Sequence, residues 1–398
     1  PKQEKDVDTD DDDRAAAVRT DAGQDENVGQ GELSQKDRRR DKGDGRENDD
    51  EDDDEDEDDD EDEGVRVQTH FEISAASGAQ KEEKKAPPVT IDLLGTLRAK
   101  FEYQPGEGDA RFQVRNARVN VGGNVLPQLS YFIQIDACDR GKMLFLDAWG
   151  QWDFNSRWKI RAGQFRVPFG TDCFRAPGDY YFANCSFIAK NILNMREVGV
   201  KGGYYGSGKL PLTVEAGVFN SADKANHEVW QRQMNYAVKA SYRIGNVTLS
   251  PSFISYQPQH VRINLVGGTV TWKSGRWIAE GEYANKHYTN RAHRAADSWN
   301  VFASYCMPLR NTVLDQLSFQ ARFDGITDHS TGVAGEDGHL TTDQNACRRV
   351  TAGASIAHIN GAVKGLVRIN YEKYFYDSGV IAPKGADDKI LAELVVKF

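Results

Sequence analysis

From about residue 90 onward, apolar and polar residues alternate along the chain. In the first such segment Leu97 and Phe101 fall on one face, and Arg98 and Lys100 fall on the other. The same alternation recurs many times, for example over residues 314–324. A period of two, rich in Val, Tyr, Phe, Trp and Thr and interrupted by Gly, Asn, Asp and Pro, is typical of β-strands with one apolar face.

The alternation predicts sixteen strands, each of about the ten residues that a tilted strand needs to cross a membrane. They are expected over residues 90–103, 110–121, 129–137, 143–154, 158–166, 197–205, 211–219, 234–243, 246–256, 262–273, 276–288, 298–305, 314–324, 347–356, 363–374 and 388–398. The last of them ends on an aromatic residue, Phe398.

The lengths of the connections identify the kind of all-β protein. If both termini lie in the periplasm, the periplasmic turns 121–129, 154–158, 205–211, 243–246, 273–276, 305–314 and 356–363 are all short. The long connections 166–197, 219–234, 288–298, 324–347 and 374–388 then lie outside. This asymmetry predicts a transmembrane antiparallel β-barrel of about sixteen strands. A soluble protein of two stacked sheets is the alternative, and it gives no reason for such asymmetry.

Charge separates the N-terminal part from the rest. The 398 residues carry a formal net charge of -11, but residues 1–63 contain 30 acidic and 10 basic side chains, which leaves 31 acidic and 40 basic on residues 64–398. The run 49–63 is entirely acidic. A segment so charged and so poor in apolar residues cannot offset its ordering entropy. We therefore expect a disordered acidic segment and linker over 1–88, and a barrel over 89–398.

The composition excludes several other classes. No apolar stretch is long enough for a membrane-spanning helix, and the mean hydropathy is -0.65. The five cysteines lack CxxC spacing, which argues against a zinc site and a disulfide scaffold, although a bridge between Cys173 and Cys185 stays open. We expect no metal and no cofactor. The chain starts at Pro1 without a signal-peptide pattern, so we expect that any export signal was removed or never included.

Three segments resemble one known family. Residues 111–136, "RFQVRNARVNVGGNVLPQLSYFIQID", resemble the second and third strands of the phosphate-selective porin O and P family of Gram-negative outer membranes. Residues 160–170, "IRAGQFRVPFG", resemble its motif at the entry of the constriction loop, and 196–204, "REVGVKGGY", resemble the strand that leaves it. The resemblance covers roughly 90–398 and implies an outer-membrane porin that forms a homotrimer. Departures are Thr171, Asp172 and Cys173 after Pro-Phe-Gly, and the acidic N-terminal segment.

An anion that crosses a bilayer needs its lost hydration replaced, which basic side chains in a lumen can supply. Strand parity and the connection after residue 166 give the candidate pore-lining and anion-binding residues. They are Arg98, Lys100, Arg111, Arg115, Arg118, Lys159, Arg161, Arg166, Arg175, Lys190, Arg196 and Lys201. Further inward bases are Lys239, Arg243, Arg322 and Arg368, and inward acids are Asp92, Asp136, Asp147, Glu215, Glu280, Glu282 and Glu372.

Three structural expectations accompany these residues. Arg115 and Arg118 differ in parity, so a bulge near Asn116 is needed to turn both inward. By resemblance, the 166–197 connection folds inward and narrows the pore; the alternative is an external loop. Aromatic residues at strand ends beside the short turns are expected to form a girdle at the membrane interface: Trp149, Trp152, Trp158, Trp272, Trp277, Tyr204, Tyr205 and Tyr242. Many bases could equally pair with the inward acids.

These observations lead to one functional prediction. No GxSxG, HExxH or phosphate-binding glycine loop is present, so an enzyme is not expected, although a triad could be assembled from separate strands. Nucleic-acid binding is not expected either, since the N-terminal segment is acidic. We predict a passive outer-membrane diffusion channel for small anions, phosphate among them. The alternative is a structural barrel subunit of a larger outer-membrane complex, docked through residues 1–63 to a periplasmic or outer-membrane partner. The acidic segment could also be a spacer or a weak binder of divalent cations.

Overall fold

The computed structural model describes residues 89–192, 195–208, 210–221, 230, 232–309, 313–335, 338–360, 363–380, 382–383 and 385–398. The expected disordered segment, residues 1–88, lies outside the described residues. Among the described residues, no helix is both long and apolar enough to cross a lipid bilayer.

All sixteen predicted strands are confirmed. They are β1 Asp92–Gln104, β2 Asp109–Leu126, β3 Leu129–Asp139, β4 Lys142–Asp153, β5 Trp158–Arg166, β6 Arg196–Tyr205, β7 Leu212–Phe219, β8 Asn235–Ile244, β9 Val247–Tyr256, β10 Ile263–Ser274, β11 Trp277–Tyr288, β12 Ala296–Pro308, β13 Gln316–Ile326, β14 Cys347–Asn360, β15 Val363–Tyr376 and β16 Lys389–Lys397. The strand β2 runs five residues past its predicted end, because pairing with β3 continues through Gly122 and Gly123 after the alternation has faded.

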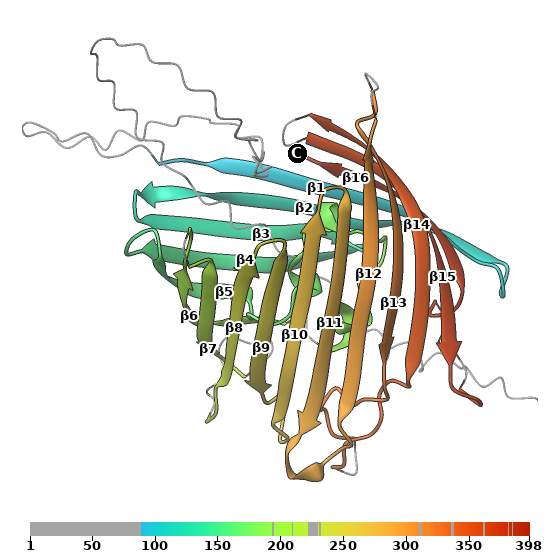
Figure 1. Ribbon diagram of the computed structural model, residues 1–398. Helices are drawn as coiled ribbons and strands as arrows, with labels where there is room; N and C mark the ends of the chain where they lie inside the picture. Colours follow the sequence, from blue (N-terminus) through green and yellow to red (C-terminus); the bar gives the residue numbers. More distant parts are fainter. Residues whose placement is uncertain are drawn as a thin grey trace, which may run out of the picture.

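The strands form one closed antiparallel barrel in which β1 pairs with both β2 and β16. In Figure 1 the chain runs round the wall from β1 in cyan to β15 and β16 in red. At the seam, Gly95 and Phe398 exchange two backbone hydrogen bonds, with N to O distances of 2.7 and 3.0 Å. A Cβ atom on Gly95 would lie 2.3 Å from the Phe398 ring, so only glycine lets the terminal aromatic pack there. Closure leaves no exposed sheet edge.

Apolar and charged residues occupy the opposite sides from those of a soluble protein. Large apolar side chains such as Val301, Phe319 and Val367 are 45–54% exposed on the outer face, whereas Arg118 and Glu393 are 2% exposed inside. An apolar outer face and a polar interior suit a barrel surrounded by lipid. The alternative of a soluble two-sheet protein is therefore wrong.

The expected bulge is present on β2. Arg98 of β1 lies opposite Asn116, and the next residue, Ala99, lies opposite Val114, so Arg115 is the extra residue. Arg115 and Asn116 are consecutive and both buried, whereas Val114 is exposed. The bulge therefore places Arg115 and Arg118 on the same inner face, as their difference in parity required.

The connections differ between the two ends of the barrel, as expected. At one end they comprise residues 127–128, 154–157, 206–211, 245–246, 275–276, 309–315 and 361–362. At the other end, 105–108, 140–141 and 257–262 are short and 289–295 is no longer than 309–315, whereas 167–195, 220–234, 327–346 and 377–388 are long. We call the first end the short-turn end. The described chain enters the wall there, since β1 begins opposite the end of β2.

The expected aromatic girdle needs two corrections. Trp152, Trp158, Trp272, Trp277 and Tyr242 are 38–55% exposed on the outer face, as a girdle requires. Trp149 and Tyr205 instead face the lumen, where the Trp149 ring contacts Arg161 and the Tyr205 hydroxyl donates to Glu215. Side chains separated by an even number of residues share one face of a strand. Trp149 is two residues from the buried Gln151 and Tyr205 is four residues from the buried Lys201, so both face the lumen.

Replacing Val301 by arginine tests the outward face of β12. Because Val301 is 54% exposed near the middle of its strand, the variant would place a charge in hydrocarbon. We expect the free energy of unfolding in lipid vesicles to fall by about 2–4 kcal/mol. Val301→Leu, which keeps the surface apolar, should change it little. Equal stabilities for the arginine and leucine variants would contradict a lipid-facing position.

Candidate functional site

The connection between β5 and β6, residues 167–195, contains three short helical turns, η1 Asp172–Phe174, η2 Pro177–Asp179 and η3 Ile188–Ile192. It begins with Val-Pro-Phe-Gly, and Gly170 adopts φ +69°, a left-handed conformation that favours glycine. A Cβ atom at Gly170 would lie 2.6 Å from Oε1 of Glu282. The local sequence therefore produces a sharp turn that brings the backbone directly against the wall strand β11.

Backbone donors at this turn are held by the wall. Glu282 accepts hydrogen bonds from the backbone N–H groups of Thr171 and Asp172, at 2.7 and 3.1 Å. The Gly170 N–H donates to Ser252 Oγ at 3.2 Å, and Lys239 Nζ donates to the Gly170 carbonyl. The first part of the connection is thereby fixed to β8, β9 and β11.

The middle of the connection is fixed to a different part of the wall. The Ala183 N–H donates to Asn370 Oδ1 at 2.7 Å, and the Phe187 N–H donates to Asp324 Oδ2 at 3.0 Å. In return, Arg98 donates to the Ala183 carbonyl at 2.8 Å. These contacts reach β15, β13 and β1, so residues 167–195 extend across the lumen.

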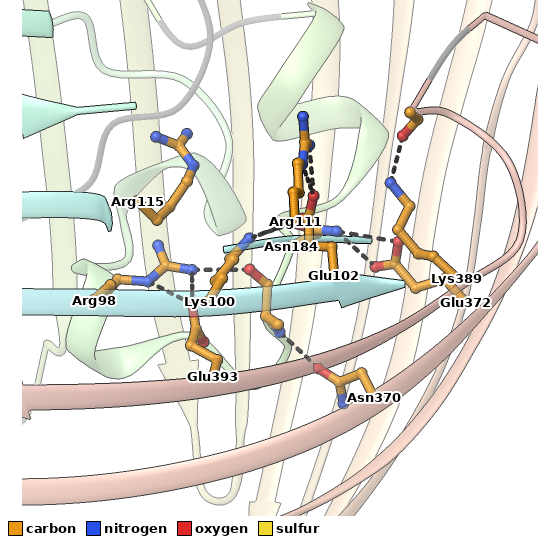
Figure 2. A network of polar contacts seen from close by, with 12 residues as sticks. Arg98, Lys100, Glu102, Arg111, Arg115, Asn184, Asn370, Glu372, Lys389 and Glu393 are labelled. Atoms are coloured by element: carbon orange, nitrogen blue, oxygen red, sulfur yellow. Dashed lines mark hydrogen bonds and ion pairs between the residues drawn. The ribbon is translucent and has the colours of Figure 1, made fainter. Parts of the chain in front are cut away.

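Further arginines hold the same stretch by its carbonyl groups. The bonds are Arg368 Nη1 to Phe182 O at 2.8 Å, Arg322 Nη1 to Asn184 O at 2.8 Å and Arg349 Nη2 to Cys185 O at 2.7 Å. Figure 2 shows Asn184 between Lys100 and Glu372, which it contacts at 2.5 Å and 3.1–3.2 Å, and Arg98 beside Glu393. A cavity of about 10 Å³ remains between this stretch and the wall at Asn300 and Arg322.

An internal contact braces the connection. Asp172 Oδ2 accepts from both the N–H and the hydroxyl of Ser186, at 3.0 and 2.6 Å, and Arg175 donates to Oδ1 at 2.6 Å. Burial raises the pKa of Asp172, but Arg175 and the Ser186 bonds outweigh it, so the pKa lies below its usual value. The charged Asp172 carboxylate thus links η1 to Ser186, which lies just before η3.

The structure therefore gives residues 167–195 an inward course rather than that of an external loop. We call this segment the constriction loop. Its polar contacts with the wall lie on β8, β9, β11, β13–β16 and β1, and Tyr181 and Phe182 also pack against Phe302 of β12. The lumen faces of β4–β7 form the remaining lining, and Phe165 of β5 and Phe219 of β7 pack in one apolar cluster with Phe187 and Ile188 of the loop.

Arg161 of β5 is the central base of that lining. Its guanidinium lies 3.6 Å from the centroid of the Trp149 ring, and Nε and Nη2 donate to Gln151 Oε1 at 3.0 and 2.7 Å. Its hydrogen-bond partner is thus a neutral amide rather than a carboxylate. A guanidinium held flat on an indole is fixed in position while its positive charge is retained.

Three more bases surround Arg161, and we call these four residues the basic face. Lys159 pairs with Asp153 at 3.2 Å, and Lys201 pairs with Glu215. Lys239 donates to a backbone carbonyl and lies 4.6 Å from the Phe174 ring centroid. The four bases Lys159, Arg161, Lys201 and Lys239 have two carboxylates, Asp153 and Glu215, as ion-pair partners. The face keeps a positive excess.

The candidates on β1 and β2 lie inside the barrel but mostly beside acids. Their contacts are Arg98 with Glu393 at 2.7 Å, Lys100 with Asn184, Arg111 with Glu102, Arg115 with Asp139, and Arg118 with Asp136 at 3.0 Å. Arg111 keeps 59% of its side chain exposed. The alternative that the bases pair with inward acids thus fits most of these residues. Anion binding by any of them stays a prediction.

The candidates beside and within the constriction loop make a different contact in each case. Arg166 donates to the Cys173 carbonyl, Arg175 pairs with Asp172 and Glu280, and Arg196 contacts Asp147 at 3.0 Å and Gln134 at 2.9 Å. Lys190 is exposed. Arg166 and Arg175 hold the loop in place, Arg196 ties β6 to β3 and β4, and Lys190 lies on the surface of the loop.

Arg349 was not among the sequence candidates. It contacts Asp324 at 2.7 Å and Glu372 at 3.3 Å while holding the Cys185 carbonyl. The alternation along β14 could have identified it, because Arg349 shares the lumen-facing parity of the buried Thr351 and Ser355, whereas Val350 is exposed. The adjacent Arg348, 57% exposed at the strand end, obscures that alternation. Glu393 of β16 is also buried and was also absent from the sequence candidates.

The cysteines and metal-ligating residues add no second site. All five cysteines are free, including Cys173 and Cys185, which lie in one buried cluster with Tyr180 and Ala189. Within the described ranges no group of three or more His, Cys, Asp or Glu residues could hold a metal ion.

Comparisons with known proteins give a family match and several similar folds. The model of the family "Phosphate-selective porin O and P" matches residues 94–247, which confirms the resemblance over the first eight strands. No curated protein sequence matches the chain.

Three solved structures share the barrel. An anion-selective porin from Comamonas acidovorans has a TM-score of 0.55 at 11% identity, covering 78% of this chain and 100% of that one. The trimer form of OmpT, an outer membrane protein of Vibrio cholerae, has a TM-score of 0.52 at 13% identity, covering 78% and 99%. Salmonella typhi OmpF in complex with daunomycin has a TM-score of 0.51 at 13% identity, covering 78% and 98%. Identities this low show the fold alone.

Replacing Glu282 by alanine tests the anchoring of the constriction loop. The change removes the acceptor of two backbone hydrogen bonds. A hydrogen bond contributes about 0.5–1.5 kcal/mol, so the loss of two should make amide hydrogen exchange in residues 167–192 roughly five- to hundredfold faster. Asp315→Ala, which removes an acceptor in a remote short turn, serves as the control. Unchanged exchange in 167–192 would show that Glu282 does not hold the loop.

Proposed function

We propose that this chain, whose residues 94–247 match the phosphate-selective porin O and P family, is a bacterial outer-membrane porin that passes small anions by passive diffusion. The passage borders the basic face on β5, β6 and β8. The observation that carries this proposal is the position of Arg161, flat on Trp149 and bonded to the neutral Gln151.

The physical reason is the loss of hydration. An anion that enters a narrow lumen loses part of its hydration shell, and basic side chains replace it. Charges of one sign beside low-dielectric walls also raise the local concentration of counter-ions. Arg161, with Lys159 and Lys201 on either side, supplies such charges on strands β5 and β6. The lining therefore favours anions over cations.

The comparisons support this preference and extend it to candidate ions and assembly. A porin of the same fold, from Comamonas acidovorans, is described as anion-selective, and the matching family is named for phosphate. Phosphate and chloride are therefore the ions to compare. The OmpT structure of the same fold is a trimer, which supports a homotrimer of this chain in the outer membrane. The proposed activity is that of a channel rather than an enzyme.

Neutralising the basic face should lower anion preference. In planar bilayers with a KCl gradient, we expect Arg161→Gln combined with Lys201→Gln to reduce the chloride to potassium permeability ratio by about threefold, because two charges leave the lining. The readout is the reversal potential. Arg276→Gln, in an exposed short turn, is the matched control. Reversal potentials equal to those of the control would contradict the assignment.

The same bilayers distinguish phosphate binding from general anion passage. If phosphate binds at the basic face, added phosphate should lower the chloride current of the unaltered protein and lower it less in the double variant. A protein that inserts but conducts no current would instead favour the alternative, a structural subunit docked through residues 1–63.

A further inference from the structure

The connection between β13 and β14 folds back into the barrel at the end opposite the short turns. It is described over residues 327–335 and 338–346, which we call the β13–β14 segment. A Cβ atom at Gly332 would lie 2.5 Å from Cδ1 of Ile263, a buried residue on the inner face of β10. Leu340 packs against the apolar cluster that the wall shares with the constriction loop. The β13–β14 segment therefore covers part of the inner wall.

Polar side chains of β11 hold the start of this segment. Lys286 Nζ, on a residue that is 2% exposed, donates to the Ser330 carbonyl at 2.6 Å. The Tyr288 hydroxyl donates to the same carbonyl at 2.5 Å and accepts from the Ser330 N–H at 2.9 Å. Asp343 Oδ2 accepts from the N–H and the hydroxyl of Thr331, both at 2.6 Å. A buried ammonium group is thus one of the anchors of the segment.

His329 lies next to this anchor in the sequence and is fully buried. Its backbone N–H donates to the Gln344 carbonyl at 3.1 Å, whereas neither ring nitrogen makes a hydrogen bond of normal geometry. Burial, together with the nearby Lys286 charge, lowers the pKa of the His329 ring to about 3. The packed segment therefore accommodates this ring in its neutral form.

Other ionisable groups on the elements that pack against His329 do not compensate a charge there. These groups are Lys286 and Tyr288 of β11, His260 and Arg262 of the β9–β10 connection, Arg291, His293 and Arg294 of the β11–β12 connection, and Asp328, His339 and Asp343 of the segment itself. Lys286 and His293 disfavour a charged His329 ring, and Asp343 favours one. Asp343 is engaged by Thr331, and Asp328 pairs with Arg294. In the described part of the chain, no carboxylate forms an ion pair with the His329 ring.

We propose that His329 is an acid-sensitive latch, whose protonation releases the β13–β14 segment from the inner faces of β10 and β11. The physical reason is that a charged imidazole cannot stay buried beside the Lys286 ammonium without a counter-ion. The inference goes beyond the proposed function and does not depend on which ion the barrel passes.

The sign of the pH dependence follows from proton uptake. A histidine in a released segment binds a proton below its ordinary pKa of about 6.5, whereas the packed His329 ring does so only near about 3. Between these values the released form holds the extra proton, so the ratio of released to packed segment rises by up to about tenfold for each pH unit of acidification. From about pH 7 to about pH 4.5, release should become roughly fifty- to hundredfold more favourable.

Amide hydrogen exchange of the full chain in lipid vesicles tests this latch at about pH 7 and about pH 4.5, with rates corrected for the intrinsic effect of pH. We expect exchange in 327–335 and 338–346 to become roughly fifty- to hundredfold faster in acid, while exchange in β12 changes little. His329→Phe, which loses no ring hydrogen bond of normal geometry and cannot be protonated, should remove the acceleration. His287→Gln, which replaces an exposed histidine of β11, is the matched control and should keep it.

Three outcomes would overturn the inference. The first is equal corrected exchange of the segment at both pH values in the unaltered protein. The second is an acceleration in His329→Phe as large as in the unaltered protein, which would assign the release to another group such as Asp343. The third is an equal acceleration in β12, which would show that acid loosens the whole barrel rather than this segment.

Discussion

The structure depends on one constraint, that backbone N–H and C=O groups in hydrocarbon must all be hydrogen-bonded within the protein. The sheet meets it by closing, with β1 pairing with β16 and Gly95 exchanging bonds with Phe398 at the seam. Closure fixes an inside and an outside, and the period of two then sends alternate residues to each. Apolar residues face lipid, so the charged half of every strand must face the lumen.

A lumen filled with charge creates a second requirement, because buried ions are costly unless they are paired and hydrogen-bonded. The constriction loop meets part of it. Its backbone donors satisfy Glu282, Asn370 and Asp324, and its carbonyls satisfy arginines of the facing wall. The loop is thus the polar partner of β8, β9, β11, β13–β16 and β1. On β5, Arg166 also binds the loop through the Cys173 carbonyl, whereas Lys159 and Arg161 bond to Asp153 and Gln151 of β4.

The sequence predicted the wall well because a period of two survives in each strand and turn residues mark the ends. It also predicted the bulge, since Arg115 and Arg118 could not otherwise share a face. It could not predict the partners. Asp172 with Ser186 and Glu282 with Thr171 depend on how a 29-residue connection folds inside the barrel, and no local pattern encodes that. Trp149 was misplaced because an aromatic residue near a strand end suits either lipid or lumen.

Pairing also bears on the anion preference proposed above, because the lumen contains many carboxylates. An ion pair whose members contact each other contributes little field beyond the Debye length, so Arg118 with Asp136 and Arg98 with Glu393 largely cancel. Arg161 differs, because its contacts are an indole and an amide, both uncharged. The proposed selectivity then rests on bases without a contacting carboxylate, such as Arg161, rather than on the total number of bases.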